Sequence, residues 1–173
     1  MALIYPFLFL SAAGFIAVAA VHVASLFGAT YLFERSLGFL GPGIFIVWLP
    51  TIFVANRLCR DFKQKDFWRA ALRGCPEWMR RGVWIIIGYA WVGFFALPLL
   101  YGGGMESVAN KARSMSAVFL TFYLIAGSVM YSATRVEKLD ASRQCLNGHR
   151  ISPSAKFCEE CGAPVQQFDH SSR

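Results

Sequence analysis

Four long segments of this chain contain no Asp, Glu, Lys or Arg: they cover residues 1–33, 36–56, 82–105 and 114–134 of the 173-residue sequence. The hydrocarbon core of a bilayer requires about 20 apolar residues in a helix, and each segment reaches that length. The alternative is a soluble bundle, but a helix on a soluble surface needs a polar face. The pattern therefore predicts an all-α integral membrane protein with four transmembrane helices in two hairpins.

The predicted membrane domain comprises residues 1–133, with spans over residues 3–33, 37–56, 83–101 and 115–132. The first span is too long for the apolar region of a cleaved signal peptide, which is about 7–15 residues, and no basic segment precedes it. The second span allows two interpretations. We favour a turn at Gly41–Gly43, a helix from Ile44 and a kink at Pro50. A re-entrant segment is the alternative.

Basic residues are concentrated between the second and third predicted spans. Residues 57–82 contain eight Lys and Arg against three acidic residues, whereas residues 34–36 and 102–113 contain one and two basic residues. Basic loops remain on the cytoplasmic side of a membrane. We therefore predict a bacterial inner-membrane protein with the 57–82 loop in the cytoplasm, and four spans place both termini there too.

The same loop combines its cations with aromatic side chains, which predicts an amphipathic helix lying at the membrane interface. We expect it to contact the lipid bilayer and anionic lipid headgroups. Nucleic acid is the competing partner for a basic and aromatic stretch, but the position between two spans favours lipid over nucleic acid. The predicted membrane-interface residues are Arg57, Arg60, Lys63, Lys65, Trp68, Arg69, Arg73, Trp78, Arg80 and Arg81.

Small residues recur at helical spacing in the first predicted span. A stripe of this kind lets a second helix approach closely in lipid. It predicts a homo-oligomer or a complex with another membrane protein, although an alanine-rich span also gives such spacing by composition alone. The predicted helix-packing residues are Ala12, Ala20, Ala24 and Gly28.

Metal-ligand chemistry is concentrated near the C-terminus. Cys145 and His149 form a Cys-x3-His pair around Asn147-Gly148, and Cys158 and Cys161 form a Cys-x2-Cys pair followed by Gly162. Three thiolates and one imidazole complete a tetrahedral shell for Zn²⁺, whereas a catalytic zinc keeps one position open. The sequence thus predicts one structural zinc ion per chain, and a reducing cytoplasm would keep the thiols free.

The stretch around these ligands resembles the short zinc-ribbon family found at the ends of many bacterial proteins. The resemblance covers about residues 143–165, and its first pair departs from the family's common Cys-x2-Cys form. It implies a structural metal and a contact module, and it implies no reaction. The resulting division is a linker at 134–144, a zinc ribbon at 145–165 and a disordered tail at 166–173.

The predicted spans offer little for catalysis. They contain no charged side chain, and the sequence shows no phosphate loop, nucleophile elbow or carboxylate pair. His22 is expected to hydrogen-bond a neighbouring helix rather than bind a cofactor. We therefore expect a non-enzymatic accessory, scaffold or sensor subunit whose cytosolic ribbon docks a protein partner. The alternative is a small oligomeric channel or transporter subunit, which a polar stripe along the spans would favour.

Overall fold

The computed structural model describes residues 4–101, 107–141, 145, 147–149, 151, 155 and 157–164. Its helices are α1 (Ile4–Leu26), α2 (Tyr31–Cys59), the 3-10 turn η1 (Gln64–Asp66), α3 (Phe67–Ala71), α4 (Glu77–Tyr101) and α5 (Val108–Ala141). Within these described ranges there is no strand, and one isolated antiparallel bridge joins Phe157 to Pro164. The all-α prediction is confirmed at this level.

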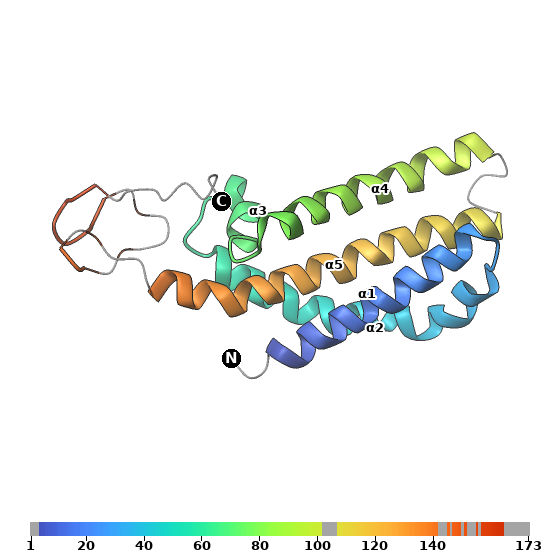
Figure 1. Cartoon of the computed structure of the whole chain (residues 1–173), viewed down its shortest axis with the longest axis horizontal. Coiled ribbons are helices and arrows are strands. Elements are labelled where there is room, and N and C mark those ends of the chain that lie inside the picture. Colours follow the sequence, from blue (N-terminus) through green and yellow to red (C-terminus); the bar gives the residue numbers. More distant parts are fainter. Residues whose placement is uncertain are drawn as a thin grey trace.

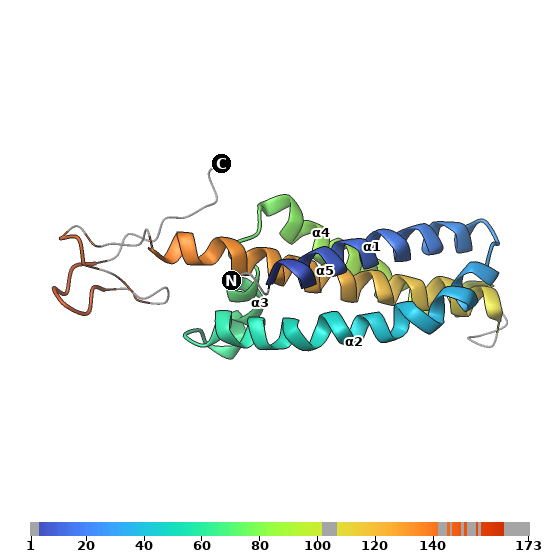
Figure 2. The ribbon, with the colours of Figure 1, turned by 90° about the horizontal axis from the view of Figure 1, so that it is seen from below.

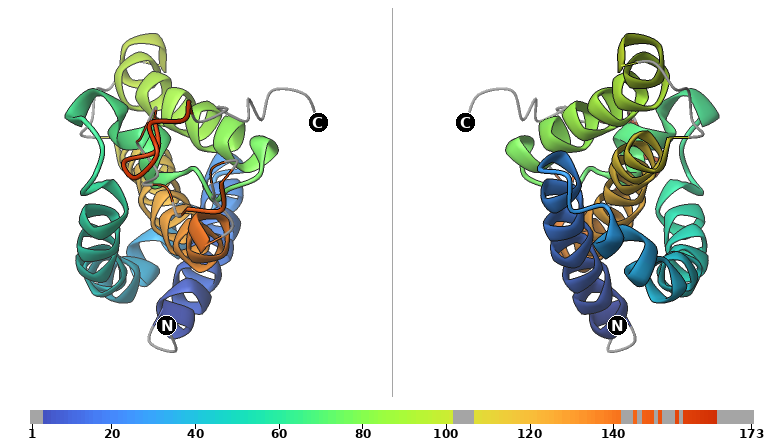
Figure 3. Two further views of the ribbon diagram at one scale, coloured as in Figure 1. Left: turned by 90° about the vertical axis from the view of Figure 1, so that its left-hand side faces the viewer. Right: turned by 90° about the vertical axis from the view of Figure 1, so that its right-hand side faces the viewer.

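The long helices α1, α2, α4 and α5 alternate in direction along the long axis of the molecule (Figure 1). The start of α1 and the end of α5 lie at one end, and the turn between α1 and α2 lies at the other (Figure 2). A view along the axis shows α1, α2 and α4 around α5 (Figure 3). Because α5 packs against all three of the other long helices, it forms the centre of the bundle.

Three helical segments are long and apolar enough to cross a membrane: Ile4–Leu26, Tyr31–Cys59 and the Val108–Val136 part of α5. The third predicted span falls within α4. The side chains of residues 97–101, at the end of this helix, lie outside the described part of the structure. The structure thus gives three candidate spans, and the assignment of α4 as a fourth rests on the charge-free sequence 82–105.

Polar side chains occupy much of the bundle interior, while large apolar side chains cover its surface. Phe9, Phe53 and Trp91 are 77%, 74% and 63% exposed. Lipid, unlike water, is a favourable neighbour for such side chains, and small polar residues let helices pack closely within it. The buried polar residues are Ser11, His22, Ser25, Ser36, Thr51, Asn110, Ser114, Ser116, Ser128 and Ser132.

Most of these hydroxyls are satisfied by backbone carbonyls. Ser25 donates to the carbonyl of His22 at 2.7 Å, and Thr51 donates to that of Val47 at 2.8 Å. Such bonds within a helix turn remove the cost of burying a hydroxyl away from water. Thr121 follows the same pattern and donates to the carbonyl of Ala117. Ser128 does not, because its hydroxyl oxygen is buried with no hydrogen-bond partner.

Tyr123 of α5 fits into a slot between two glycines of neighbouring helices. A Cβ at Gly14 of α1 would overlap the Tyr123 ring, and a Cβ at Gly43 of α2 would lie 2.5 Å from the Tyr123 hydroxyl oxygen. The hydroxyl donates to the carbonyl of Leu40 at 3.0 Å. Because Tyr123 is only 3% exposed, this slot joins α1, α2 and α5 at the middle of the core.

The prediction of one span over residues 3–33 is wrong. Helix α1 ends at Leu26, and α2 begins at Tyr31. Gly28 lies in the intervening turn with φ of 91°, a left-handed conformation that favours glycine. Residues 34–36, which we predicted as a connection, belong to the first turns of α2. The sequence does not indicate this turn because no charged residue marks it.

Helix α2 also differs from the favoured interpretation of the second span, 37–56. It runs without interruption from Tyr31 to Cys59, with both Pro42 and Pro50 inside it. Proline in a helix interior removes one hydrogen bond and bends the axis, but it does not always end the helix. The predicted turn at Gly41–Gly43 and the re-entrant alternative are therefore both wrong.

The pattern of the 57–82 loop predicted one amphipathic helix at the membrane interface. The loop does not form one helix. It comprises the end of α2, η1, the five-residue α3 and the start of α4. Leu72 and Cys75 are buried against Ala55 and Val129, so part of the loop folds into the bundle. The Gly74 N–H donates to the Ser132 hydroxyl at 3.0 Å, which attaches this segment to α5.

The fourth predicted span, 115–132, is the middle of a longer helix. Helix α5 begins at Val108 and continues to Ala141, through most of the predicted linker 134–144. Val136 is still buried at 4% exposure, so the bundle contacts extend past the span. Residues 102–106, in the predicted connection before the fourth span, and the predicted tail at 166–173 lie outside the described residues.

Candidate metal centre

The first pair of candidate ligands lies on a tight turn. The Gly148 N–H donates to the Cys145 carbonyl at 2.9 Å, and the Cys145 N–H donates to the His149 carbonyl, also at 2.9 Å. Gly148 has φ of 80°, as the Asn147-Gly148 pair predicted. The chain therefore reverses within four residues, and both side chains face the same side.

The second pair lies on a knuckle of the same kind. The Gly162 N–H donates to the Cys158 carbonyl at 2.9 Å, and the Cys158 N–H donates to the Ala163 carbonyl at 2.8 Å. Gly162 has φ of 70°, which explains why glycine follows Cys161. The bridge between Phe157 and Pro164 closes the base of this knuckle.

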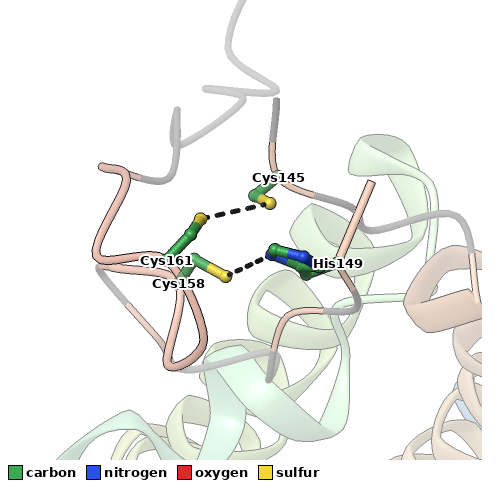
Figure 4. Close-up of side chains that lie close together, drawn as sticks. All are labelled: Cys145, His149, Cys158 and Cys161. Carbon is green, nitrogen blue, oxygen red and sulfur yellow. Dashed lines mark hydrogen bonds between the residues drawn. The ribbon is translucent and has the colours of Figure 1, made fainter. Parts of the chain in front are cut away.

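The two turns bring all four ligand atoms within 4.8 Å of one another. Cys145 Sγ lies 3.7 Å from Cys161 Sγ, and Cys158 Sγ lies 3.7 Å from His149 Nδ1 (Figure 4). Tetrahedral zinc, with Zn–S of about 2.3 Å and Zn–N of about 2.0–2.1 Å, requires S–S and S–N separations of about 3.6–3.8 Å. The cluster could therefore hold a metal ion with little rearrangement.

Glu160 completes the surroundings of the histidine ligand. One of its carboxylate oxygens lies 3.5 Å from His149 Nε2, the ring nitrogen that faces away from Cys158. Metal-binding histidines commonly direct the second ring nitrogen to a carboxylate, which fixes the tautomer and the ring plane. The contact of Glu160 with His149 depends on a knuckle geometry that the ligand spacing alone does not show.

In the part of the metal unit that the structure describes, there is almost no core apart from the ligands. Its buried side chains are Cys145, Ile151 and Cys158, with Ala155 packed against them. Three residues and a partly buried alanine cannot offset the conformational entropy of ordering about 20 residues. All three cysteines are free rather than in disulfides. These features fit a metal-stabilised unit, in which the ion supplies the folding free energy.

The predicted membrane-interface residues surround one end of the bundle. Trp78 is 73% exposed and Trp68 is 37% exposed. Arg73 and Arg80 are half-buried, and the Arg73 guanidinium lies 4.9 Å from the centroid of the Phe62 ring. The remaining predicted cations are exposed: Arg57, Arg60, Lys63, Lys65, Arg69 and Arg81.

The predicted helix-packing stripe does not face the inside of this chain. Ala12 and Ala20 are exposed, Ala24 is half-buried, and Gly28 lies in the turn after α1. The inward face of α1 instead carries Ser11, Val18, His22 and Ser25. A stripe that faces outward is available to a second membrane protein or to a copy of this chain, so the predicted packing between molecules stays a prediction.

His22 joins three helices, which confirms the expected bond to a neighbour. Its Nδ1 lies 2.7 Å from the Ser116 hydroxyl of α5, and its Nε2 lies 2.7 Å from the Tyr89 hydroxyl of α4. The His22 and Tyr89 rings also meet edge to face, with centroids 5.5 Å apart. These two polar bonds tie α1 and α4, which both pack on α5, to each other.

Comparison of the chain with protein-family models, curated proteins and solved structures finds no match. The resemblance to the zinc-ribbon family therefore rests on the ligands, their spacing and the two glycine turns.

Proposed function

We propose that this chain is a four-span protein of the bacterial inner membrane, with both termini in the cytoplasm. It acts as a non-enzymatic accessory, scaffold or sensor subunit. Its C-terminal unit is a zinc ribbon that binds one structural Zn²⁺ ion and docks a cytosolic protein. The bundle holds this unit at the membrane surface and packs with copies of itself or with another membrane protein.

The observation that carries this proposal is the closed ligand set. Cys145, His149, Cys158 and Cys161 supply four donors within 4.8 Å, so a tetrahedral ion would retain no open position for water or substrate. Thiolate and imidazole donors in this number favour zinc over magnesium or calcium, which prefer oxygen. The site is thus suited to stabilising the fold of a small unit rather than to catalysis.

The surface of the metal unit supports docking. Phe157 is 61% exposed although it lies next to the ligand Cys158 and within the bridge to Pro164. An aromatic side chain held rigidly in water is a common anchor in protein interfaces. Glu159 beside it is exposed as well, which adds an acidic rim. A partner with an apolar pocket flanked by basic residues would complement this surface.

The membrane placement is supported by the distribution of side chains. Large apolar residues cover the outside of the bundle, and several serines lie inside it. The basic loop 57–82 lies at the end where α5 terminates, so the positive-inside rule places that end in the cytoplasm. Single-cysteine variants labelled with a membrane-impermeant thiol reagent would test this topology. Labelling of position 170 from the periplasm would contradict it.

The docking role can be tested on the full chain, cross-linked in cells and purified in mild detergent. We expect a cytosolic protein to be cross-linked to the wild type and lost from both Phe157→Ala and Cys158→Ser. Ile85→Ala, which removes an exposed apolar side chain from α4, is the matched control and should retain it. An unchanged cross-linked set in Cys158→Ser would refute docking by the ribbon, and ion flux in proteoliposomes would favour the channel alternative.

A further inference from the structure

An open surface cavity of about 280 Å³ lies at the end of α2, where the chain turns into η1 and α3. Its polar wall comprises Asn56, Arg60, Lys63 and Gln64, and its apolar wall includes Phe62 and Phe67. The volume is slightly below that of typical small-molecule pockets, about 300–1,000 Å³. It is sufficient for a small headgroup and too small for a whole lipid.

The charge around this cavity favours an anion. Arg60 and Lys63 contribute two cations, and the Arg73 guanidinium lies 4.9 Å from the centroid of the Phe62 ring in the cavity wall. The nearby acidic residues Asp61 and Asp66 do not line the cavity. Two cations and two side-chain amides together offer the charge-assisted donors that a phosphate group requires.

The tryptophans place the cavity at headgroup depth. Trp68 on α3 and Trp84 on α4 meet edge to face with ring centroids 6.1 Å apart, and both are partly exposed. Exposed tryptophans accumulate where the hydrocarbon meets the lipid headgroups. Gln64 of η1 and Phe67, the first residue of α3, both line the cavity. The cavity therefore lies next to the helix that carries Trp68.

One face of α2 leads from hydrocarbon to cavity. Leu49, Phe53, Asn56 and Arg60 follow one another at steps of four, three and four residues, which places them along a single helix face. Leu49 is 57% exposed and Phe53 is 74% exposed, whereas Asn56 and Arg60 line the cavity. An acyl chain could follow the apolar part of this face while its phosphate occupied the polar end.

We propose that this cavity binds the phosphate of one anionic phospholipid, with Arg60 and Lys63 on the phosphate and the acyl chains along Leu49 and Phe53 of α2. The proposal rests on the membrane placement given above, and it is independent of the metal unit. The shared chemistry is a phosphate anion, which a lipid headgroup or free phosphate could supply. The apolar face of α2 favours the lipid.

The test is native mass spectrometry of the full chain in a neutral detergent, titrated with phosphatidylglycerol, phosphatidylcholine or inorganic phosphate. We expect one phosphatidylglycerol per chain, with little phosphatidylcholine. The double variant Arg60→Gln/Lys63→Gln should bind phosphatidylglycerol at least tenfold more weakly. The double variant Arg57→Gln/Lys65→Gln removes the same charge from exposed positions of the loop that do not line the cavity, and it should bind like the wild type.

Equal weakening in both double variants would overturn the proposal, because it would show that binding follows total loop charge rather than the cavity. Displacement of the lipid by an equal concentration of inorganic phosphate would overturn the lipid assignment. All four substituted side chains are exposed, so both variants should keep their fold, which tryptophan fluorescence would verify. Retained lipid binding in Cys158→Ser would separate this site from the docking role of the ribbon.

Discussion

The bundle and the metal unit are stabilised in opposite ways. The bundle buries an extensive interior in which α5 contacts every other long helix, and Tyr123 fits between Gly14 and Gly43. Among its described residues, the metal unit buries three side chains, and two of them are candidate ligands. One part depends on the shape of packed helices, and the other brings together four donor atoms that could hold an ion.

This difference implies that each part can fail without the other. Helices in lipid gain little from apolar burial, so close packing and hydrogen bonds decide how they associate. If the cluster holds a metal ion, as proposed, the metal unit gains its folding free energy from coordination. All five tryptophans, Trp48, Trp68, Trp78, Trp84 and Trp91, lie in the bundle region, and none lies in residues 142–173. Tryptophan fluorescence therefore reports on the bundle alone.

The largest effect is expected from Cys158→Ser. Loss of one thiolate should abolish tight metal binding and remove about 10 kcal/mol or more of apparent binding free energy from the metal unit. Zinc content and the absorption spectrum of the Co²⁺-substituted protein would measure this loss. The unfolding of the bundle, followed by tryptophan fluorescence in detergent, should not change. Equal zinc content in wild type and variant would contradict the ligand assignment.

A smaller effect in the opposite part is expected from Gly14→Ala. The new Cβ would overlap the Tyr123 ring, which has no free space to move because it is 3% exposed. Overpacking of this kind costs about 1–3 kcal/mol. Gly88→Ala is the matched control on α4, where a Cβ meets nothing within 4 Å. If both variants melt like the wild type, the Tyr123 slot is not a packing constraint.

A pH-dependent effect is expected from Cys75, between α3 and α4. Burial raises the pKa of this thiol from 9.0 to about 11. At a pH below both values the thiol is neutral whether the chain is folded or unfolded. As the pH rises from 9.0 towards about 11, the unfolded thiol loses its proton first, so the bundle should lose stability, by less than about 3 kcal/mol.

Comparing Cys75→Ala with the wild type at about pH 8 and about pH 10.5 would isolate this contribution from other titrating groups. The stability difference between the two proteins should shift in favour of the variant at the higher pH. A difference that does not depend on pH would show that the thiol ionises equally in both states. The zinc content of Cys75→Ala should equal that of the wild type.

The smallest effect on the isolated chain is expected from Ala12→Leu/Ala20→Leu. Both positions are exposed, so the folded chain should be altered by no more than about 0.5 kcal/mol. If this stripe packs against a second membrane protein or a copy, cross-linked complexes should nonetheless decrease. Val23→Leu, at an exposed position one turn away, is the control. Identical complexes in all three proteins would show that the stripe reflects composition only.

The metal cluster could be predicted from sequence because its determinants are local. Each ligand pair lies within five residues, and each turn has a glycine whose left-handed φ the structure confirms. The contact of Glu160 with His149 could not be predicted, because it depends on how the second knuckle turns towards the first. The identity of the metal follows from donor chemistry and stays a prediction.

The bundle was less predictable because its determinants are distant in sequence. Segments without charge identify helices, but they contain no marker of where a turn occurs, and Gly28 was placed inside a helix that ends at Leu26. The slot around Tyr123 requires contacts about 80 to 109 residues apart, to Gly43 and Gly14. Most of the cations and both tryptophans in 57–82 are exposed, but the aromatic and basic pattern did not show that Leu72 and Cys75 fold inward.

The length of α5 determines how freely the metal unit can move. The helix is continuous to Ala141, and only four peptide units separate that residue from Cys145. Four extended residues span at most about 14 Å, so the unit is tethered close to the tip of a rigid rod. A short tether gives an effective concentration in the millimolar range. A protein that docked on the metal unit would therefore meet the end of the bundle at this effective concentration, at which even an intrinsically weak contact is occupied.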